Sequence, residues 1–301
     1  MLLNNIVNKY GPPDAIIDYW QKSNKVKKLI YGLEDIIKIY HNKCLINDKI
    51  IKGNPFVILQ DWIEESKKKS SSNLSTIGYI NYNFKDLIYK HINFKNKSLS
   101  EPLLWFARPK KIIPFDECNN KDTGSYLNIK KDLIGLSDYK KKINEIKSFI
   151  KSGYTYQINY TQPKEYILKK DPFKLFLKAR QIAQPPFGYY LNTKDIQIIS
   201  LSPELFFSLN DGIIQTKPMK GTRPNNGEPN NKIEIENLRN SIKDQSEHIM
   251  IVDLLRNDLG KICNYNSIKV KKLFEIKTYK SVHQMISTIY GQTKNGLKEI
   301  D

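Results

Sequence analysis

Three short stretches of the sequence carry polar residues that could do chemistry, and the first holds an acid. Glu204 stands at the head of an apolar strand pattern, Ser202-Pro203-Glu204-Leu205-Phe206-Phe207. Apolar surroundings raise the pKa of a carboxyl group, which can then donate a proton near neutral pH. A carboxylate at a strand end that faces water is the alternative interpretation, and the residue alone does not decide between them.

The second stretch offers a nucleophile, Lys220, in Pro218-Met219-Lys220-Gly221-Thr222-Arg223-Pro224. A lysine acts as a nucleophile or base only when its pKa is brought well below ~10.4. The neighbouring Gly221 and Thr222 could approach a bound anion through their amides and hydroxyl. Glu204 and Lys220 lie on the two arms of one predicted hairpin region, so we expect them to meet. An ordinary surface lysine is the alternative.

The third stretch is a predicted helix over residues 243–258. At helical spacing one of its stripes holds Glu247, Met250, Ile251, Leu254 and Asp258. A carboxylate on a core-facing stripe is costly unless it meets a cation. That cation could be a Lys or Arg side chain, or a Mg²⁺ ion held through carboxylates and substrate oxygens.

One histidine lies close to these stretches. His283 falls inside the apolar strand pattern of residues 281–288, and the chain has only four histidines. Such a residue is more often a hydrogen-bonded core histidine than a catalytic one. Its position is therefore a mild indication of function.

The first 125 or so residues give weaker signals of structure. Asn54 followed by Pro55 predicts a capped helix over 54–63, with a polar loop at 64–73. A second loop is expected between residues 108 and 124. We take it as the boundary between an N-terminal subregion, 1–125, and a C-terminal region, 126–301.

Mixed strands and helices fill the C-terminal region. Helices are expected at 139–152, from residue 171, and at 232–257, because apolar residues recur there at helical spacing. Strands are expected at 154–162, 187–191, 196–202, 205–209, 213–216, 267–279 and 282–290. Asn210-Asp211-Gly212 reads as a three-residue hairpin loop. Many hairpins beside helices favour an α+β fold over a doubly wound parallel sheet.

Charge first suggests a nucleic-acid partner. The 301 residues carry 49 Lys+Arg against 31 Asp+Glu, a formal charge of +18. Only five of these cations are Arg, the residue that nucleic-acid sites favour, and residues 203–263 hold eight Lys/Arg against nine Asp/Glu. The excess is therefore spread over lysine outside the motif region, and we expect no specific nucleic-acid binding.

Cysteine usage and hydropathy indicate a cytoplasmic protein. Cys44, Cys118 and Cys263 form no CxxC or Cys/His spacing, so they predict neither a disulfide framework nor a zinc site. No stretch approaches the ~20 apolar residues of a membrane span, and the N-terminus lacks a signal-peptide pattern. We expect no membrane association.

Five ordered motifs resemble those of the chorismate-utilising enzymes, which include the first components of anthranilate synthase and aminodeoxychorismate synthase. The motifs are Ser152–Asn159, Ser202–Glu204, Lys217–Pro224, Lys243–Gly260 and the Val282-His283 strand. The resemblance is clear from about residue 139 to 291. It implies a two-lobed β-sandwich with outer helices. Because Lys220 stands where anthranilate synthases usually have Ala, it is closest to aminodeoxychorismate synthase component I.

The resemblance also implies an activity, conversion of chorismate and ammonia to 4-amino-4-deoxychorismate on the way to p-aminobenzoate and folate. Glu204 would be the general acid and Lys220 the nucleophile that forms a covalent intermediate. Gly221, Thr222 and His283 would lie against the substrate, and Glu247 would bind Mg²⁺. A separate glutamine amidotransferase would supply the ammonia.

Two departures from the family pattern bear on activity. Family members continue into a segment with further substrate contacts and a second acidic Mg²⁺ ligand, and here the sequence stops at Asp301. We expect a C-terminally truncated fold with little activity unless another polypeptide supplies the remainder. Anthranilate synthase component I and an inactive remnant are the alternatives. Feedback by tryptophan is unsupported, because its usual binding motif is not evident.

Overall fold

The computed structural model describes residues 2–300 apart from 22–23, 93, 95–99, 117–123 and 133. It divides into two compact units, one formed by Met1–Cys118 with Arg180–Asp301, the other by Asn119–Ala179. The boundary expected at residue 125 falls within the second unit, and the proposed division stays a prediction. Cys118 lies outside the described residues, whereas Cys44 and Cys263 are buried free thiols.

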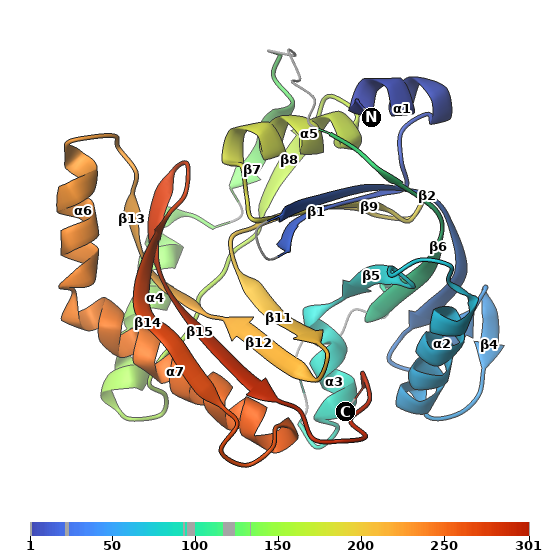
Figure 1. The fold of residues 1–301 in the computed structure, drawn as a ribbon. Coiled ribbons are helices and arrows are strands. Elements are labelled where there is room, and N and C mark those ends of the chain that lie inside the picture. The colour runs from blue at the N-terminus through green and yellow to red at the C-terminus, as the bar shows by residue number, and fades with distance from the viewer. Residues whose placement is uncertain are drawn as a thin grey trace. The chain divides into compact units, whose positions relative to one another are not determined.

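An eight-stranded antiparallel sheet dominates the N-terminal part of the first unit (Figure 1). Its strands follow the order β10-β9-β1-β2-β3-β4, and β6 pairs with both β2 and β5. The strands are β1 (Ala15–Gln21), β2 (Asn24–Ile39), β3 (Cys44–Ile46), β4 (Lys49–Ile51), β5 (Ile77–Ile80), β6 (Leu104–Pro114), β9 (Phe187–Asn192) and β10 (Gln197–Ser202). The strands expected at 187–191 and 196–202 are thus confirmed. The loop expected from residue 108 is wrong as far as Pro114, because β6 continues there against β2.

Short helices accompany this sheet. They are α1 (Leu3–Tyr10), α2 (Pro55–Lys69), the 3₁₀ turn η1 (Tyr82–Phe84) and α3 (Lys85–Ile88). The predicted cap of α2 is confirmed, since the Asn54 side chain accepts a hydrogen bond from the Phe56 amide at 2.9 Å. The helix runs six residues beyond the predicted 63 because Trp62, Ile63 and Ser66 are buried. Its core partners include Ile37, Ile39 and Leu104.

A five-stranded antiparallel sheet carries the motif region. Its strands are β11 (Leu205–Asn210), β12 (Ile213–Lys217), β13 (Met219–Pro224), β14 (Lys269–Thr278) and β15 (Val282–Gln292). The long strand β15 pairs with β12, β13 and β14, so it is the centre of the sheet. The hairpin expected between β11 and β12 is confirmed, but its three-residue loop is wrong. Asn210 pairs directly with Ile213, so the hairpin turns on two residues, Asp211 and Gly212, both with positive φ.

Two helices, α6 (Asn230–Arg239) and α7 (Ile242–Ile262), follow β13 and contact this sheet (Figure 1). The sequence predicts one helix from 232 to 257, but the structure has two, because the helical conformation is interrupted at residues 240–241. Ser241 takes the N-cap position of α7, and its side chain accepts a hydrogen bond from the Asp244 amide at 3.3 Å. The capping group therefore ends one helix and begins the next.

The second unit holds β7 (Leu127–Asp132) paired with β8 (Lys164–Leu168), helix α4 (Leu136–Lys151), and most of α5 (Pro172–Ala183). The helix expected at 139–152 is confirmed, as is the start of α5 at Pro172, where Asp171 Oδ1 accepts from the Phe173 amide at 2.9 Å. The strand expected at 154–162 is wrong. Tyr154 and Tyr156 are 82% and 86% exposed, and their aromatic propensity finds no partner strand among the described residues. The mixture of helices and antiparallel sheets confirms the α+β class.

Candidate functional site

The turn between β10 and β11 holds Glu204. Its amide donates to Ser202 Oγ at 3.2 Å, and its carboxylate oxygen Oε1 accepts from the Met219 amide at 3.2 Å. Neighbouring protein desolvates the carboxyl group and raises its pKa, although the Met219 hydrogen bond and the charge of Lys220 act in the opposite direction. The direction of the predicted pKa shift is confirmed, whereas the role of Glu204 as an acid stays a prediction. The carboxylate is also brought next to the residue that precedes Lys220.

A bulge in β13 follows Lys220. Lys220 pairs with Met285 and Thr222 with Gln284, so Gly221 is an extra residue between two successive pairs. Its φ of +79° is the left-handed conformation that a bulge of this kind requires, and glycine adopts it without steric cost. The bulge is therefore a structural reason for glycine at position 221, in addition to the predicted contact with a substrate. Thr222, the next residue, is exposed.

Close packing gives a second reason for glycine at this position. A Cβ atom on Gly221 would lie 2.8 Å from Leu238 Cδ1 and 3.1 Å from Asp244 Cβ. The first turn of α7 and the end of α6 thus touch the β13 backbone. This contact brings the helix that carries Glu247 against the strand that carries Lys220.

An ion pair joins the same two elements. Arg223 Nη2 donates to Asp244 Oδ2 at 2.8 Å. Desolvation acts against it, but hydrogen bonds from Ser241 and Arg223 hold the pKa of Asp244 below its usual value. Asp244 is buried, so loss of Arg223 would leave an unpaired carboxylate beside the bulge. β13 and α7 are therefore linked by charge as well as by packing.

The face of α7 that packs inward differs from the predicted stripe. Its buried residues are Asp244, His248, Val252 and Leu259. Met250 and Leu254, on the predicted stripe, are 43% and 55% exposed. The expected core position of Glu247 is thus wrong: its side chain is 34% exposed and lies 3.6 Å from Lys243 Nζ. The sequence left two cations as possible partners of Glu247, a basic side chain and Mg²⁺. Lys243 is the first of these.

The sequence analysis missed His248. It is fully buried, and its Nε2 lies 2.7 Å from Ser287 Oγ, which also accepts a hydrogen bond from the Phe274 amide. Burial lowers its pKa to about 4, so the ring is neutral at neutral pH. The signal available was its spacing, four residues after Asp244 and four before Val252, which places all three on one helix face.

His283 has protein partners on both ring nitrogens. Nδ1 lies 2.9 Å from Thr278 Oγ1, and Nε2 lies 3.1 Å from Asn231 Oδ1. The ring is fully buried, and across the sheet the residue pairs with Arg223. These contacts suit a core histidine that holds α6 to the sheet. A substrate contact through His283 stays a prediction.

The candidate site therefore centres on β13. Glu204 is bonded to its first residue, Lys220 precedes its bulge, and α7 with Glu247 packs against the bulge. Among the described residues no group of three or more His, Cys, Asp or Glu could hold a metal ion. Within the same residues, no helix is long and apolar enough to cross a membrane.

Comparisons with a family model and with curated proteins point to the same family. The model of the chorismate binding enzyme family matches residues 116–301. Anthranilate synthase component 1 of Saccharolobus solfataricus is 30% identical over 81% of this chain and 62% of its own length. Aminodeoxychorismate synthase component 1 of Salmonella typhimurium is 36% identical over 54% of this chain and 36% of its own length. The chain thus spans less than two thirds of either relative.

Solved structures agree on the fold. Anthranilate synthase component I from Streptococcus pneumoniae superposes with a TM-score of 0.74 at 19% identity, covering 93% of this chain and 72% of that one. Identity at this level is evidence of a shared fold. It extends the similarity to the part of the chain before residue 116, which the family model does not match.

Proposed function

This chain belongs to the family of chorismate-binding enzymes, and we propose that within it the chain aminates chorismate to 4-amino-4-deoxychorismate. One observation carries the proposal. The carboxyl group of Glu204, with its pKa raised by desolvation, is hydrogen-bonded to the amide that immediately precedes Lys220. A carboxyl group with a raised pKa stands beside a primary amine, the pair that covalent substitution of a hydroxyl group needs.

In the first step the amine of Lys220, once it has lost its extra proton to water, attacks C2 of chorismate. The ring double bonds shift, the bond from C4 to its hydroxyl breaks, and the hydroxyl leaves as water with the proton of Glu204. The Glu204 carboxylate then takes a proton from the new secondary ammonium of Lys220. One difficult displacement is thereby divided into two easier ones.

In the second step ammonia attacks C4 and the double bonds return. The bond between C2 and Lys220 breaks, and Glu204 protonates the departing amine. The ammonium at C4 returns a proton to Glu204, which restores the starting carboxyl group. The sum is chorismate plus ammonia giving 4-amino-4-deoxychorismate plus water.

Glu247 is the residue that would hold Mg²⁺. Its carboxylate is partly exposed, and Lys243 at 3.6 Å is its ion-pair partner among the described residues. This setting fits an ion that keeps several waters and takes one or two protein carboxylates. The bound ion would neutralise the carboxylate of the substrate. Gly221 and Thr222 would present backbone and hydroxyl groups to the substrate at the bulge.

The component 1 names of the relatives support a partner subunit. We infer that this partner is a glutamine amidotransferase that delivers ammonia in the cytoplasm. Because the chain spans 36% of the Salmonella relative, the activity of the whole protein is part of the same proposal. The Saccharolobus relative covers more of the chain and favours a second candidate, anthranilate synthesis.

Product identification separates the candidates. The protein is incubated with chorismate, ammonium chloride and MgCl₂, and the products are analysed by mass spectrometry. We expect a low but measurable yield of 4-amino-4-deoxychorismate from this chain alone, and its loss in Lys220→Ala, whereas Lys232→Ala on the exposed surface of α6 keeps it. Anthranilate formation that survives Lys220→Ala would favour the second candidate, and no product from the unaltered protein would contradict both.

A further inference from the structure

The pairing of the central strand β15 is irregular on both sides at Ser287. On one side Pro218, the residue between β12 and β13, accepts a hydrogen bond from the Ser287 amide at 3.3 Å. Proline has no N–H, so it cannot return the second hydrogen bond that such a pair usually exchanges. On the other side the register of β14 shifts between Lys271 and Glu275. The regular backbone ladder is therefore interrupted on both sides of Ser287.

The side chain of Ser287 supplies contacts where the ladder is interrupted. Its hydroxyl oxygen accepts a hydrogen bond from the Phe274 amide at 3.2 Å, and His248 Nε2 lies 2.7 Å from the same oxygen. Ser287 and His248 are 1% and 0% exposed, so these contacts are shielded from water. One buried hydroxyl group thus joins β15 to β14 and to α7.

The peptide group between Pro218 and Met219 connects Ser287 to the candidate site. Its carbonyl accepts from the Ser287 amide, and its N–H donates to Glu204 Oε1 at 3.2 Å. Lys220 follows directly in the chain. Two hydrogen bonds on opposite sides of one peptide plane strengthen each other and fix the orientation of that plane. The direction in which Glu204 holds its carboxyl group therefore depends on where Ser287 is held.

We propose that Ser287 is a positioning residue for the candidate site. Its hydroxyl group, anchored to α7 and β14, fixes the Pro218–Met219 peptide. That peptide in turn sets the places of the Glu204 carboxyl group and the Lys220 amine, so Ser287 acts through the peptide rather than on the substrate. The inference rests on the proposed amination for the chemistry that Glu204 and Lys220 perform, whereas its hydrogen bonds can be tested without any substrate.

Hydrogen–deuterium exchange of the Met219 amide, resolved by mass spectrometry with electron-transfer fragmentation, measures the bond to Glu204 directly. Ser287→Ala removes the hydroxyl group and should speed this exchange at least tenfold. Ser287→Thr keeps a hydroxyl group on the same carbon and should stay within threefold of the unaltered protein. The amide of Ile30, a fully buried residue of the eight-stranded sheet, is the internal reference for global unfolding. Acceleration at Met219 without acceleration at Ile30 supports the inference.

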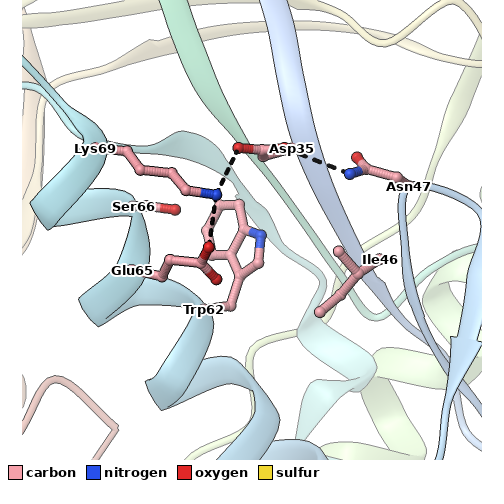
Figure 2. Close-up of a pocket in the computed structure, with 7 residues that line it drawn as sticks. All are labelled: Asp35, Ile46, Asn47, Trp62, Glu65, Ser66 and Lys69. Carbon is pink, nitrogen blue, oxygen red and sulfur yellow. Dashed lines mark hydrogen bonds and ion pairs between the residues drawn. The ribbon is translucent and has the colours of Figure 1, made fainter.

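Two variants are matched controls. Ser66→Ala makes the same change at another buried serine, 3% exposed, which lies on α2 beside the hollow shown in Figure 2. Thr293→Val removes a buried hydroxyl group just after the end of β15, where it donates to the Gly212 carbonyl at 3.1 Å. Among the described residues neither hydroxyl bonds to the Pro218–Met219 peptide, so both variants should leave the exchange of the Met219 amide within twofold.

Turnover supplies a second readout that a loss of stability alone would not move. The Met219 hydrogen bond lowers the pKa of Glu204, so a looser bond lets that pKa rise. Because Glu204 donates its proton in the proposed reaction, the limb of the rate–pH profile that falls with rising pH should move to higher pH in Ser287→Ala. At pH 7, kcat should fall at least tenfold while the KM for chorismate stays within twofold, and both controls should match the unaltered protein.

The outcomes separate this inference from the proposed amination. Unchanged exchange at Met219 in Ser287→Ala, equal acceleration at Met219 and Ile30, or equal effects in the two controls would overturn the inference. If exchange follows the expected pattern but the unaltered protein yields no 4-amino-4-deoxychorismate, the hydrogen-bond network is supported and the amination fails. If product forms and Ser287→Ala keeps the full kcat, the positioning role is overturned and the amination stands.

Discussion

The two sheets of the first unit bury different kinds of side chain. Around the eight-stranded sheet the core consists mainly of aliphatic and aromatic groups such as Ile30, Leu104 and Trp105. Around the five-stranded sheet the core also holds polar side chains, which are Asp244, His248, His283 and Ser287. Their hydrogen bonds join strands β13 and β15 to helices α6 and α7. The first sheet is held mainly by apolar packing, with the buried ion pair of Asp18 on β1 and Arg180 beside it. The second is held in part by polar contacts that fix β13, β15 and α7 in register, and these elements carry the candidate site.

The largest effect is expected in the apolar core. Leu104 is fully buried between β2 and α2, and Leu104→Ala should cost about 2–5 kcal/mol of unfolding free energy. Ile80→Ala on the neighbouring strand should cost far less, because Ile80 is 58% exposed. Urea unfolding followed by circular dichroism measures both. Equal losses would mean that packing does not distinguish these positions.

The polar core should be sensitive to pH through His248. Its pKa is about 4 in the folded protein and 6.5 unperturbed, so the unfolded state binds the proton more readily. The stability it contributes is complete above pH 6.5 and is lost as pH falls toward 4, on the order of 3 kcal/mol. The raised pKa of Glu204 works in the opposite sense.

His248→Gln, which offers an amide near the position of Nε2, should flatten this pH dependence. Unfolding free energies at several pH values between 7 and 4 measure it. The control is His41→Gln beside the eight-stranded sheet, where His41 Nε2 lies 3.0 Å from Asp86 Oδ2. If His41→Gln flattened the pH dependence of stability and His248→Gln did not, the polar core would not be the source of that dependence.

Gly221 tests the contact between strand and helix. Gly221→Ala should cost about 2–4 kcal/mol, since it adds left-handed strain to a clash with Leu238 and Asp244. Gly227 has a φ of +80° but no atom within 4 Å of its virtual Cβ. Gly227→Ala should therefore cost only the strain, about 1–2 kcal/mol. Thermal unfolding compares the two, and equal shifts would remove the packing argument.

The sequence predicted local features well and the choice of helix face poorly. Asn54, Asp171 and the Asp211-Gly212 turn act within a few residues, so their effects follow from the sequence. Apolar residues occupy more than one side of α7, and spacing alone does not select the side that meets the sheet. The buried Asp244–His248–Val252 face is chosen by tertiary partners, Arg223 and Ser287, which lie far away in the chain. A strand also depends on a tertiary partner, and residues 154–162 have none among the described residues.

The smallest expected effect compares two helix caps of like chemistry. Asn54 caps α2 and Ser241 caps α7, and replacing either with Ala should cost about 1 kcal/mol of stability. Only Ser241 also supports Asp244, the partner of Arg223 beside the Gly221 bulge. Ser241→Ala should therefore lower amination of chorismate severalfold, whereas Asn54→Ala should leave it unchanged when both are assayed well below their melting temperatures. Equal activities would mean that the polar contacts around β13 stabilise the second sheet without positioning its site.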